Sequence, residues 1–385
     1  MQKKIISEYK AVTALYTLGW ALGNPIFILF LLSKGFSLEA AGLFFAIAKL
    51  FHLILEIPSG AFADSFGRKK STMLSFALSF CGFSLFIFSS NPIVLLASAI
   101  MLGSADAFFS GSMEAYSVDR LRQRGAAMHT HKLIASGARA LYLMLLLGSI
   151  LGGFIGTFSY ELAIALGLPS LLYGIYYVNS LKSEKRESNF SDSLGNIFRN
   201  TTLSLRKCVS ISPLFLLMLI SFLTGLGAFR LFTGWPEAFS QLFGWGPLET
   251  GFVFAGISTM MIAGSKVSEI VYKRKYAFSF AILLMGLFLA LSGVLWAPIL
   301  TLVFVLLFEF SWGIHKPIMG KILHENVPSS LRATMVSLNT ASFSAGFSLS
   351  GILFFLSGGM AISLSWEISG AFFLLAALIA FFKKL

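Results

Sequence analysis

The chain has 385 residues, of which 56% are hydrophobic and 12% are charged. The charged share is about half that of an ordinary soluble domain, and a single water-facing core could not absorb so many apolar side chains. The composition excludes a soluble globular protein and indicates a protein that spans a lipid bilayer.

The positions of the Lys and Arg residues along the chain explain the net charge of +12. Most of the 29 Lys and Arg residues fall in segments predicted to face the cytoplasm, as the positive-inside rule requires. One cation, Lys34, falls in a predicted external loop. Five cations lie within apolar segments: Lys49, Arg139, Arg230, Lys266 and Lys316. This asymmetry is typical of membrane orientation, and we expect no nucleic-acid partner.

Twelve apolar segments are long enough to cross a bilayer, which takes about 20 residues each. They are 10–32, 38–63, 71–89, 92–116, 132–156, 160–181, 213–234, 250–272, 276–296, 298–320, 333–357 and 362–382. An even number of crossings puts both termini on one side of the membrane. Lysines near both ends of the chain, such as Lys3 and Lys383, place that side in the cytoplasm.

The second segment carries a stripe of charges, and a charged turn follows it. Lys49, His52 and Glu56 fall at positions i, i+3 and i+7, on one face of the helix. A proton relay through the histidine and a neutralised packing cluster both fit this stripe. The turn then reads Gly60-x3-Asp64-x2-Gly67-Arg68-Lys69. Its cations place it on the cytoplasmic side.

Two carboxylates lie near the middle of apolar segments, Asp106 on the fourth and Glu309 on the tenth. A charge at this depth costs about 2.5–3.5 kcal/mol on insertion scales, so such residues face protein or water and often have a function. A carboxyl group partly excluded from water can exchange a proton near neutral pH. We predict that Asp106 couples transport to protons and that Glu309 is its counterpart. A static ion pair between Asp106 and Arg139 is the alternative.

The fifth segment has small residues at helical spacing. They are Gly148, Gly152, Gly153 and Gly156. Glycines on one face let two helices approach backbone to backbone, so we predict a close helix contact there.

A polar stretch separates two similar halves of the chain. Residues 182–212 form either an amphipathic helix on the inner leaflet or a disordered linker. Around it, Pro92 and Pro298 open the fourth and tenth segments 206 residues apart, and Glu161 and Glu367 share this offset. The chain therefore reads as a parallel duplication of a six-helix unit. We predict domains at 1–181 and 213–385, joined by 182–212, in an all-α membrane protein of 12 transmembrane helices arranged as two pseudo-symmetric six-helix bundles.

Signatures of catalysis and of metal or cofactor binding do not occur in the sequence. There is no ATP-binding loop, no complete dinucleotide fingerprint and no nucleophile–base group. His129 and His131 have no cysteine or carboxylate companions that would suggest a metal site. We therefore expect no enzymatic activity, no cofactor and no metal.

The charged turn resembles the motif that joins helices 2 and 3 in transporters of the major facilitator superfamily. Glu56-x-Pro58, just before it, resembles a variant found in type P clostridial tetracycline exporters. The glycines of the fifth segment resemble those of the drug–proton antiporters in this superfamily, with Gly153 in place of a proline. The arginine that these antiporters carry in their fourth helix is absent here, and that region holds Asp106.

The resemblance implies a gate on the cytoplasmic side. In the superfamily, Gly60 would pack against the eleventh helix and Asp64 would lie at that helix's N-terminus, where the helix dipole favours an anion. Arg68 would pair with Asp119 at the inner end of the fourth helix.

The resemblance also implies a monomeric secondary transporter of a bacterial inner membrane, with protons and a small-molecule substrate as partners. The 41 Phe residues and the scarcity of polar side chains in the first and seventh segments favour an apolar cavity. We therefore expect proton-coupled export of amphipathic organic compounds by alternating access. An importer or uniporter of a small metabolite remains an alternative, as does a transporter-like receptor or scaffold that transports nothing.

Overall fold

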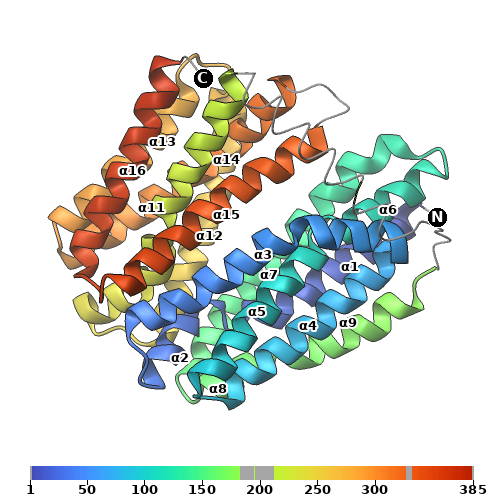
Figure 1. Ribbon diagram of the computed structural model, residues 1–385, viewed down its shortest axis with the longest axis horizontal. Coiled ribbons are helices and arrows are strands. Elements are labelled where there is room, and N and C mark those ends of the chain that lie inside the picture. The colour runs from blue at the N-terminus through green and yellow to red at the C-terminus, as the bar shows by residue number, and fades with distance from the viewer. Residues whose placement is uncertain (1, 183–194, 196–211, 327–331, 384–385) are drawn as a thin grey trace. The chain divides into compact units, whose positions relative to one another are not determined.

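The structure is a computed structural model that describes residues 2–182, 195, 212–326 and 332–383 (Figure 1). Within these ranges the regular secondary structure is entirely helical, without strands. Twelve helical spans in the described part of the chain are long and apolar enough to cross a membrane. The predicted all-α fold is confirmed. The predicted linker, 182–212, lies almost wholly outside the described residues.

The first six spans contain several short breaks. They are formed by α1 (Gln2–Ala21) with η1 (Asn24–Ile26) and α2 (Phe27–Ser33), α3 (Leu38–Phe66), α4 (Arg68–Phe88), α5 (Pro92–Phe109) with α6 (Ser112–Arg122), α7 (Thr130–Gly156) after η2 (Ala127–His129), and α8 (Tyr160–Ala165) with α9 (Leu168–Ser180).

The last six spans are single helices. They are α11 (Ser212–Phe243), α12 (Pro247–Val271), α13 (Ala277–Val294), α14 (Pro298–Asn326), α15 (Arg332–Leu356) and α16 (Ile362–Phe382).

Local sequence explains where some of these helices begin. Asn91 caps α5 by accepting a hydrogen bond from the backbone N–H of Ile93, and Pro92 occupies the first helical position. Ser159 caps α8 in the same way, by accepting from the N–H of Leu162. Asparagine and serine are favoured caps because their side chains satisfy N–H groups that have no partner inside the helix.

The chain divides into two compact units. Unit 1 contains the described residues of Met1–Phe30, Phe51–Phe198 and Pro247–Ala255. Unit 2 contains those of Leu31–Leu50, Arg199–Gly246 and Gly256–Leu385. The first part of the second span thus groups with the C-terminal helices, and the first part of the eighth span groups with the N-terminal helices.

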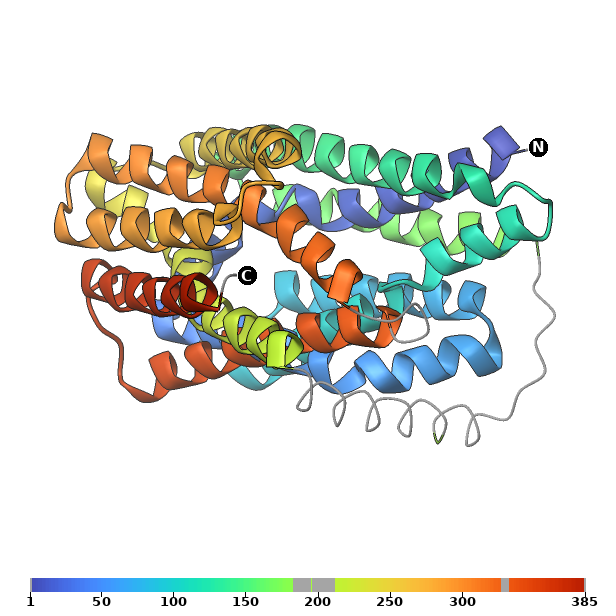
Figure 2. The same ribbon diagram turned by 90° about the horizontal axis from the view of Figure 1, so that it is seen from above.

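The two units repeat the same helix pairings. In unit 1, α1 packs against α7 and α9, while α4 packs against α5 and α9 (Figures 1 and 2). In unit 2, α11 packs against α15 and α16, while α13 packs against α14 and α16. Each pairing of unit 1 therefore has an equivalent in unit 2 six spans later. This agrees with the predicted duplication of a six-helix unit.

The glycines of the fifth span make the close contact predicted for them. A Cβ atom at Gly152 would overlap the carbonyl of Leu22, just after α1. A Cβ atom at Gly153 would meet the backbone of Gly251 at the start of α12, within unit 1. A Cβ atom at Gly148 would meet Ala21, and one at Gly156 would meet Ile26 and Pro247. Glycine is needed on this face because two backbones lie where a side chain would stand.

Several helices extend beyond the apolar segments of the sequence. The first begins at Gln2 rather than at residue 10, and its Ile5 packs in a core cluster with Leu121 and Leu133. The seventh span continues through Pro236 to Phe243 instead of ending at residue 234. Hydropathy underestimated these lengths because helical turns near the membrane surface carry polar residues.

Candidate functional site

Gly67 and Arg68 organise the charged turn between α3 and α4. The φ of Gly67 is 100°, a conformation that side chains other than glycine rarely adopt. Arg68 forms an ion pair with Asp119 of α6. The pairing that the resemblance implied is therefore present, while its role in gating remains a prediction. The contacts predicted for Gly60 and Asp64 with the eleventh span would join the two units, and they also remain predictions.

Lys69 has a role in the structure that the sequence did not suggest. Its Nζ donates to the carbonyl oxygens of Asn179, at 2.5 Å, and Leu181, at 2.9 Å. The last carbonyls of a helix lack N–H partners, and the helix dipole favours a cation beside them. Lys69 therefore caps the C-terminal end of α9 and fixes the turn to the sixth span.

Asp106 of α5 is hydrogen-bonded to the first span. The hydroxyl of Tyr16 donates to Oδ1 of Asp106 at 3.1 Å, and Ser79 of α4 donates to that hydroxyl at 3.4 Å. The ring of Tyr16 is buried and stacks on Phe109 at 3.7 Å, with 4° between the ring planes. Asp106 itself is exposed. A fixed phenol therefore positions an accessible carboxyl group.

The fourth span is broken one turn after Asp106. Gly111 is in the left-handed conformation, with φ 69° and ψ −20°, and it separates α5 from α6. The carbonyls at such a break have lost their intrahelical partners. Ser59 of α3 donates to the carbonyl of Ala107 at 3.0 Å, and Ser71 of α4 donates to that of Phe108 at 2.9 Å. The hydroxyl of Ser71 also lies 3.0 Å from that of Ser112, the first residue of α6. Hydroxyl groups from two neighbouring helices thus stabilise the break.

A second polar contact joins α1 to the fourth span beyond the break. Tyr9 donates to Glu114 of α6 at 3.4 Å, two helical turns from Tyr16 on the same face of α1. Arg120 forms an ion pair with Glu8, whose side chain is buried. These partners could not be predicted from the sequence, because a tyrosine in an apolar segment gives no signal of which carboxylate it meets.

The predicted stripe on α3 separates into two environments. Nε2 of His52 lies 3.4 Å from Oε2 of Glu56, and the histidine is buried. Lys49 belongs to unit 2, where it interacts electrostatically with Lys316 of α14. Lys49 belongs to none of the ion pairs of the described residues, and both the proton relay and the packing cluster remain predictions for this stripe.

Arg139 does not form the static pair that was the alternative for Asp106. It lies on α7 with its side chain exposed, and within the described part of the chain it belongs to none of the ion pairs. The polar partner of Asp106 is Tyr16 instead.

Glu309 is the buried carboxyl group of unit 2. Its side chain is only 2% exposed, and its Oε2 has no hydrogen-bond partner among the described residues. His315, on the same helix, is also buried, and neither of its ring nitrogens has a partner there. The ring of His315 stacks on Phe278 at 5.2 Å. Both groups lie inside the bundle of unit 2.

Two of the five cations predicted within apolar segments, Lys316 and Arg230, lie over aromatic rings of unit 2. Nζ of Lys316 is 5.5 Å from the ring centre of Trp312 and 6.0 Å from that of Phe343 on α15. The guanidinium of Arg230 on α11 lies 4.0 Å above the ring of Phe354. The Nε and Nη1 of Arg230 are buried and donate to no hydrogen-bond partner among the described residues. Aromatic faces stabilise both cations.

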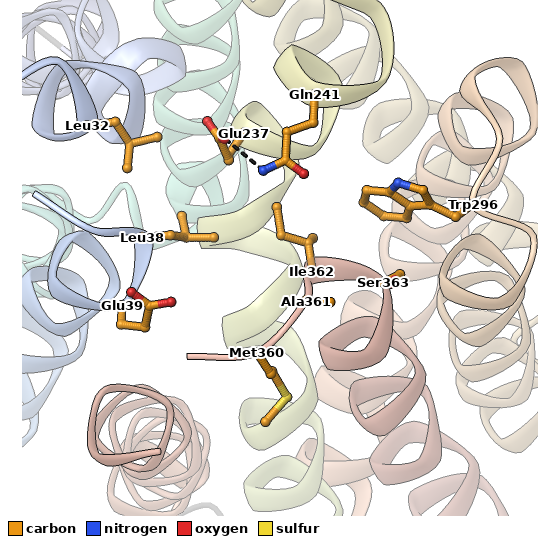
Figure 3. A pocket seen from close by; sticks show the side chains of 10 residues that line it. All are labelled: Leu32, Leu38, Glu39, Glu237, Gln241, Trp296, Met360, Ala361, Ile362 and Ser363. Carbon is orange, nitrogen blue, oxygen red and sulfur yellow. Dashed lines mark hydrogen bonds between the residues drawn. The ribbon is translucent and has the colours of Figure 1, made fainter. Parts of the chain in front are cut away.

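One pocket of unit 2 lies apart from all of these groups. It has a volume of about 300 Å³ and is formed at the ends of α2, α11 and α13 and the starts of α3 and α16 (Figure 3). Glu39, Glu237, Gln241 and Trp296 supply its polar lining, and Gln241 donates to Glu237 at 2.8 Å. None of the predicted site residues lines it. Across the described residues, no group of three His, Cys, Asp or Glu side chains could hold a metal ion.

Comparison with known proteins agrees with this architecture. The uncharacterized MFS-type transporter YxaM of Bacillus subtilis (strain 168) is 24% identical over 385 residues, which cover 96% of this chain and 94% of that protein. Among solved structures, a D-xylose-proton symporter superposes with a TM-score of 0.72 at 16% identity, covering 97% of this chain and 96% of that one. The nucleoside transporter NupG superposes with a TM-score of 0.71 at 12% identity, covering 99% and 98%.

The sequence model of the Major Facilitator Superfamily matches residues 11–351, which is most of the chain. Twelve apolar helices, the repeated pairing of helices in the two units and the ion-paired turn after the second span agree with that match. The chain therefore belongs to the Major Facilitator Superfamily and is a multi-pass membrane transporter rather than an enzyme.

Proposed function

We propose that this transporter exports amphipathic organic compounds in exchange for protons, and that Asp106 carries the proton. The observation that supports this most directly is the environment of Asp106. Its carboxyl group is accessible, lies within the fourth span, is hydrogen-bonded to the buried phenol of Tyr16, and has no ion-pair partner among the described residues.

Tyr16 suits this role because a phenol can donate to the ionised carboxylate without neutralising it permanently. An arginine partner would hold Asp106 in its charged form, whereas a hydroxyl leaves both protonation states accessible. The break at Gly111 lies five residues further along the span, so a change in the angle between α5 and α6 would alter the surroundings of Asp106. Such a change could expose the carboxyl group to each side of the membrane in turn.

Glu309 is the second candidate for proton exchange. A carboxyl group that alternates between a buried site without partners and water exchanges a proton with each change. Glu309 is buried and its Oε2 lacks a partner within the described residues, so it meets the first condition.

The remaining predicted site residues would form a gate on the cytoplasmic side, and the distribution of cations predicts which side of the membrane the termini face. Gly60, Asp64, Gly67, Arg68, Lys69 and Asp119 would close the cytoplasmic side of a monomer in the inner membrane. Both termini would face the cytoplasm, as the distribution of lysine and arginine requires. The drug–proton antiporters and the clostridial tetracycline exporters are the functional group that the motifs resemble.

Proton-coupled import of a small metabolite is the second candidate function. The D-xylose-proton symporter with the same fold makes it reasonable, although 16% identity carries the fold alone. Export is favoured here by the apolar character of the first and seventh segments of the sequence. Sugars need many hydrogen-bonding side chains, and these spans offer few.

Flux in proteoliposomes with an imposed pH gradient tests the proposal. The probes are cationic, neutral and anionic fluorescent amphipathic dyes, loaded with the gradient in either direction. We expect dye to move against the proton flow. Asp106→Asn keeps the hydrogen bond with Tyr16 but cannot ionise, so it should abolish gradient-driven accumulation while exchange of dye without a gradient persists.

Matched variants separate the candidates. Glu309→Gln tests the second carboxyl group, and Glu161→Gln, an exposed carboxylate at the start of α8, is the control that should transport normally. Arg139→Ala should also transport normally, because Arg139 does not pair with Asp106. If Asp106→Asn drives accumulation as the unmodified protein does, Asp106 does not carry the proton. If dye binds but never crosses under either gradient, the receptor alternative is right.

A further inference from the structure

Among the described residues, the cations of the apolar segments form no ion pairs with carboxylates. Ion pairs of the spans join Arg68, Arg120 and His52 to acidic side chains. The five cations of the apolar segments belong to none of them: Lys49, Arg139, Arg230, Lys266 and Lys316. A cation at membrane depth is costly unless another group compensates it. Either aromatic faces and water do so here, or a ligand does.

Lys316 has the most developed surroundings of the five. Its side chain is exposed, while its Nζ lies over the rings of Trp312 and Phe343. Trp312 is only 2% exposed and packs against Phe232 at 5.4 Å and Phe308 at 6.0 Å. The indole is therefore held in the core of unit 2, and it presents the accessible ammonium group from a rigid aromatic base.

A second ammonium group lies near the first. Lys49 of α3 interacts electrostatically with Lys316, and both belong to unit 2. Two like charges repel, so bringing the two ammonium groups together is unfavourable by itself. Glu309 attracts Lys316, but it is buried and offers one carboxyl group for two cations. A bound anion would interact favourably with both lysines and remove their repulsion.

We propose that unit 2 binds an amphipathic organic anion, with its charged group at Lys316 and Lys49 and its apolar body against the half-buried ring of Phe343. This inference rests on the proposed export of amphipathic compounds and narrows their class. A bare inorganic anion would use the two lysines but not the ring, whereas an amphipathic cation would use the ring but be repelled by both ammonium groups. Only a molecule with both parts satisfies the whole site.

Two probes with the same apolar body and opposite charge test the site directly. They are 2-naphthoate and 2-naphthylmethylamine, titrated onto purified full-length protein in lipid nanodiscs, with tryptophan fluorescence and thermal unfolding as readouts. We expect 2-naphthoate to bind and to raise the melting temperature, and the amine to do neither at the same concentrations. Inorganic phosphate should compete weakly, because it lacks the apolar part.

Charge variants identify the residues. Lys316→Met and Lys49→Met keep most of the side-chain volume and remove the charge, so each should weaken 2-naphthoate binding at least tenfold. Lys316→Arg keeps the charge and should bind within about threefold of the unmodified protein. Lys266→Met is the control and should bind 2-naphthoate normally. Lys266 is an exposed intramembrane cation on α12, and among the described contacts it does not lie over Trp312 or Phe343. The melting temperature without ligand reports whether each variant is folded.

The outcomes distinguish this inference from the proposed function. Equal binding of the amine and the acid, no binding of the acid, or unchanged binding in Lys316→Met would overturn the anion site. If Lys316→Arg loses binding as completely as Lys316→Met while Lys49→Met retains it, Lys316 is structural and the inference is wrong. Proteoliposomes test the function separately. Accumulation of the amine without any binding of 2-naphthoate would leave proton-coupled export standing and remove the anion site. Binding of 2-naphthoate with no flux under either gradient would leave the anion site standing and remove proton-coupled export.

Discussion

The break in the fourth span should depend on two serine hydroxyls from other helices. Ser59→Ala removes the donor that lies 3.0 Å from the carbonyl of Ala107, and Ser71→Ala removes the one that lies 2.9 Å from the carbonyl of Phe108. In an unbroken helix these carbonyls would bond to backbone N–H groups of the next turn. At the break, the hydroxyls take their place.

The expected loss of stability has two sources: the hydrogen bond itself is lost, and a buried carbonyl is left without a donor. Interhelical hydrogen bonds in membrane proteins contribute about 0.6 kcal/mol on average and up to about 1.7 kcal/mol. A buried carbonyl left without a donor costs about 1–3 kcal/mol. We therefore expect each single variant to lose about 1–2 kcal/mol of unfolding free energy. The double variant should lose more than either single variant, up to about 4 kcal/mol, although the losses need not add because the two carbonyls belong to adjacent residues.

Thermal unfolding in lipid nanodiscs, together with limited proteolysis between α5 and α6, measures the effect. Ser104→Ala and Ser84→Ala are the matched controls, because these hydroxyls bond only to carbonyls one turn back in their own helices, Ile100 and Phe80. Removing them should change stability by less than about 0.5 kcal/mol. If the double variant is as stable as the two controls and is cut no faster, the hydroxyls do not stabilise the break.

Two further predictions concern helix packing and the charged turn. Gly152→Ala should destabilise the protein by about 1–3 kcal/mol because its Cβ would overlap the carbonyl of Leu22, whereas Gly320→Ala in α14, with no neighbouring atom within 4 Å, should be neutral or slightly stabilising in the same thermal assay. Asp119→Arg should impair transport by leaving two cations together, and the exchanged pair Arg68→Asp with Asp119→Arg should recover at least a third of the flux. Flux that is normal in the single variant, or no better in the exchanged pair, would contradict a role for the Arg68–Asp119 bond.

Much of the fold could be predicted because each span carries its own evidence. The apolar segments and the 206-residue offset between Pro92 and Pro298 depend on sequence alone. Span ends were less accurate, since hydropathy falls wherever a helix meets polar neighbours. The fourth span was predicted to end at 116, but its helix α6 continues to Arg122 because Arg120 is neutralised by Glu8 of the first span. A partner 112 residues away cannot be inferred from local composition.

The site residues divide in the same way. Asp106 and Glu309 were identified by their depth in apolar segments, which the sequence reports directly. Their surroundings were not, because Tyr16 resembles an ordinary apolar-segment aromatic until the fold brings it to Asp106. The break after Asp106 did leave a signal, since Ser110 and Gly111 form a dipeptide typical of turns. No break was predicted there, because the dipeptide lies inside the apolar segment 92–116, which predicts one continuous span.

The duplication changes how the two carboxylates should be compared. Measured by the offset between the prolines that open α5 and α14, the equivalent of Asp106 is Trp312, and Glu309 corresponds to a glycine one turn earlier. Glu309 is therefore not the counterpart of Asp106 in register, although it lies on the equivalent helix.

The same offset aligns Gly111, where the fourth span breaks, with Pro317, which lies inside α14 directly after Lys316. Glycine and proline both weaken a helix, the first through backbone freedom and the second by removing an N–H donor. In each unit, the charged residue of the proposed site, Asp106 or Lys316, thus lies within about two helical turns of a glycine or proline that weakens the helix. Under the two proposals, unit 1 exchanges the proton at Asp106 and unit 2 holds the anion at Lys316. Because no side chain serves both ligands, their coupling must be carried by the change in helix conformation at these two points, rather than by direct competition for one charged group.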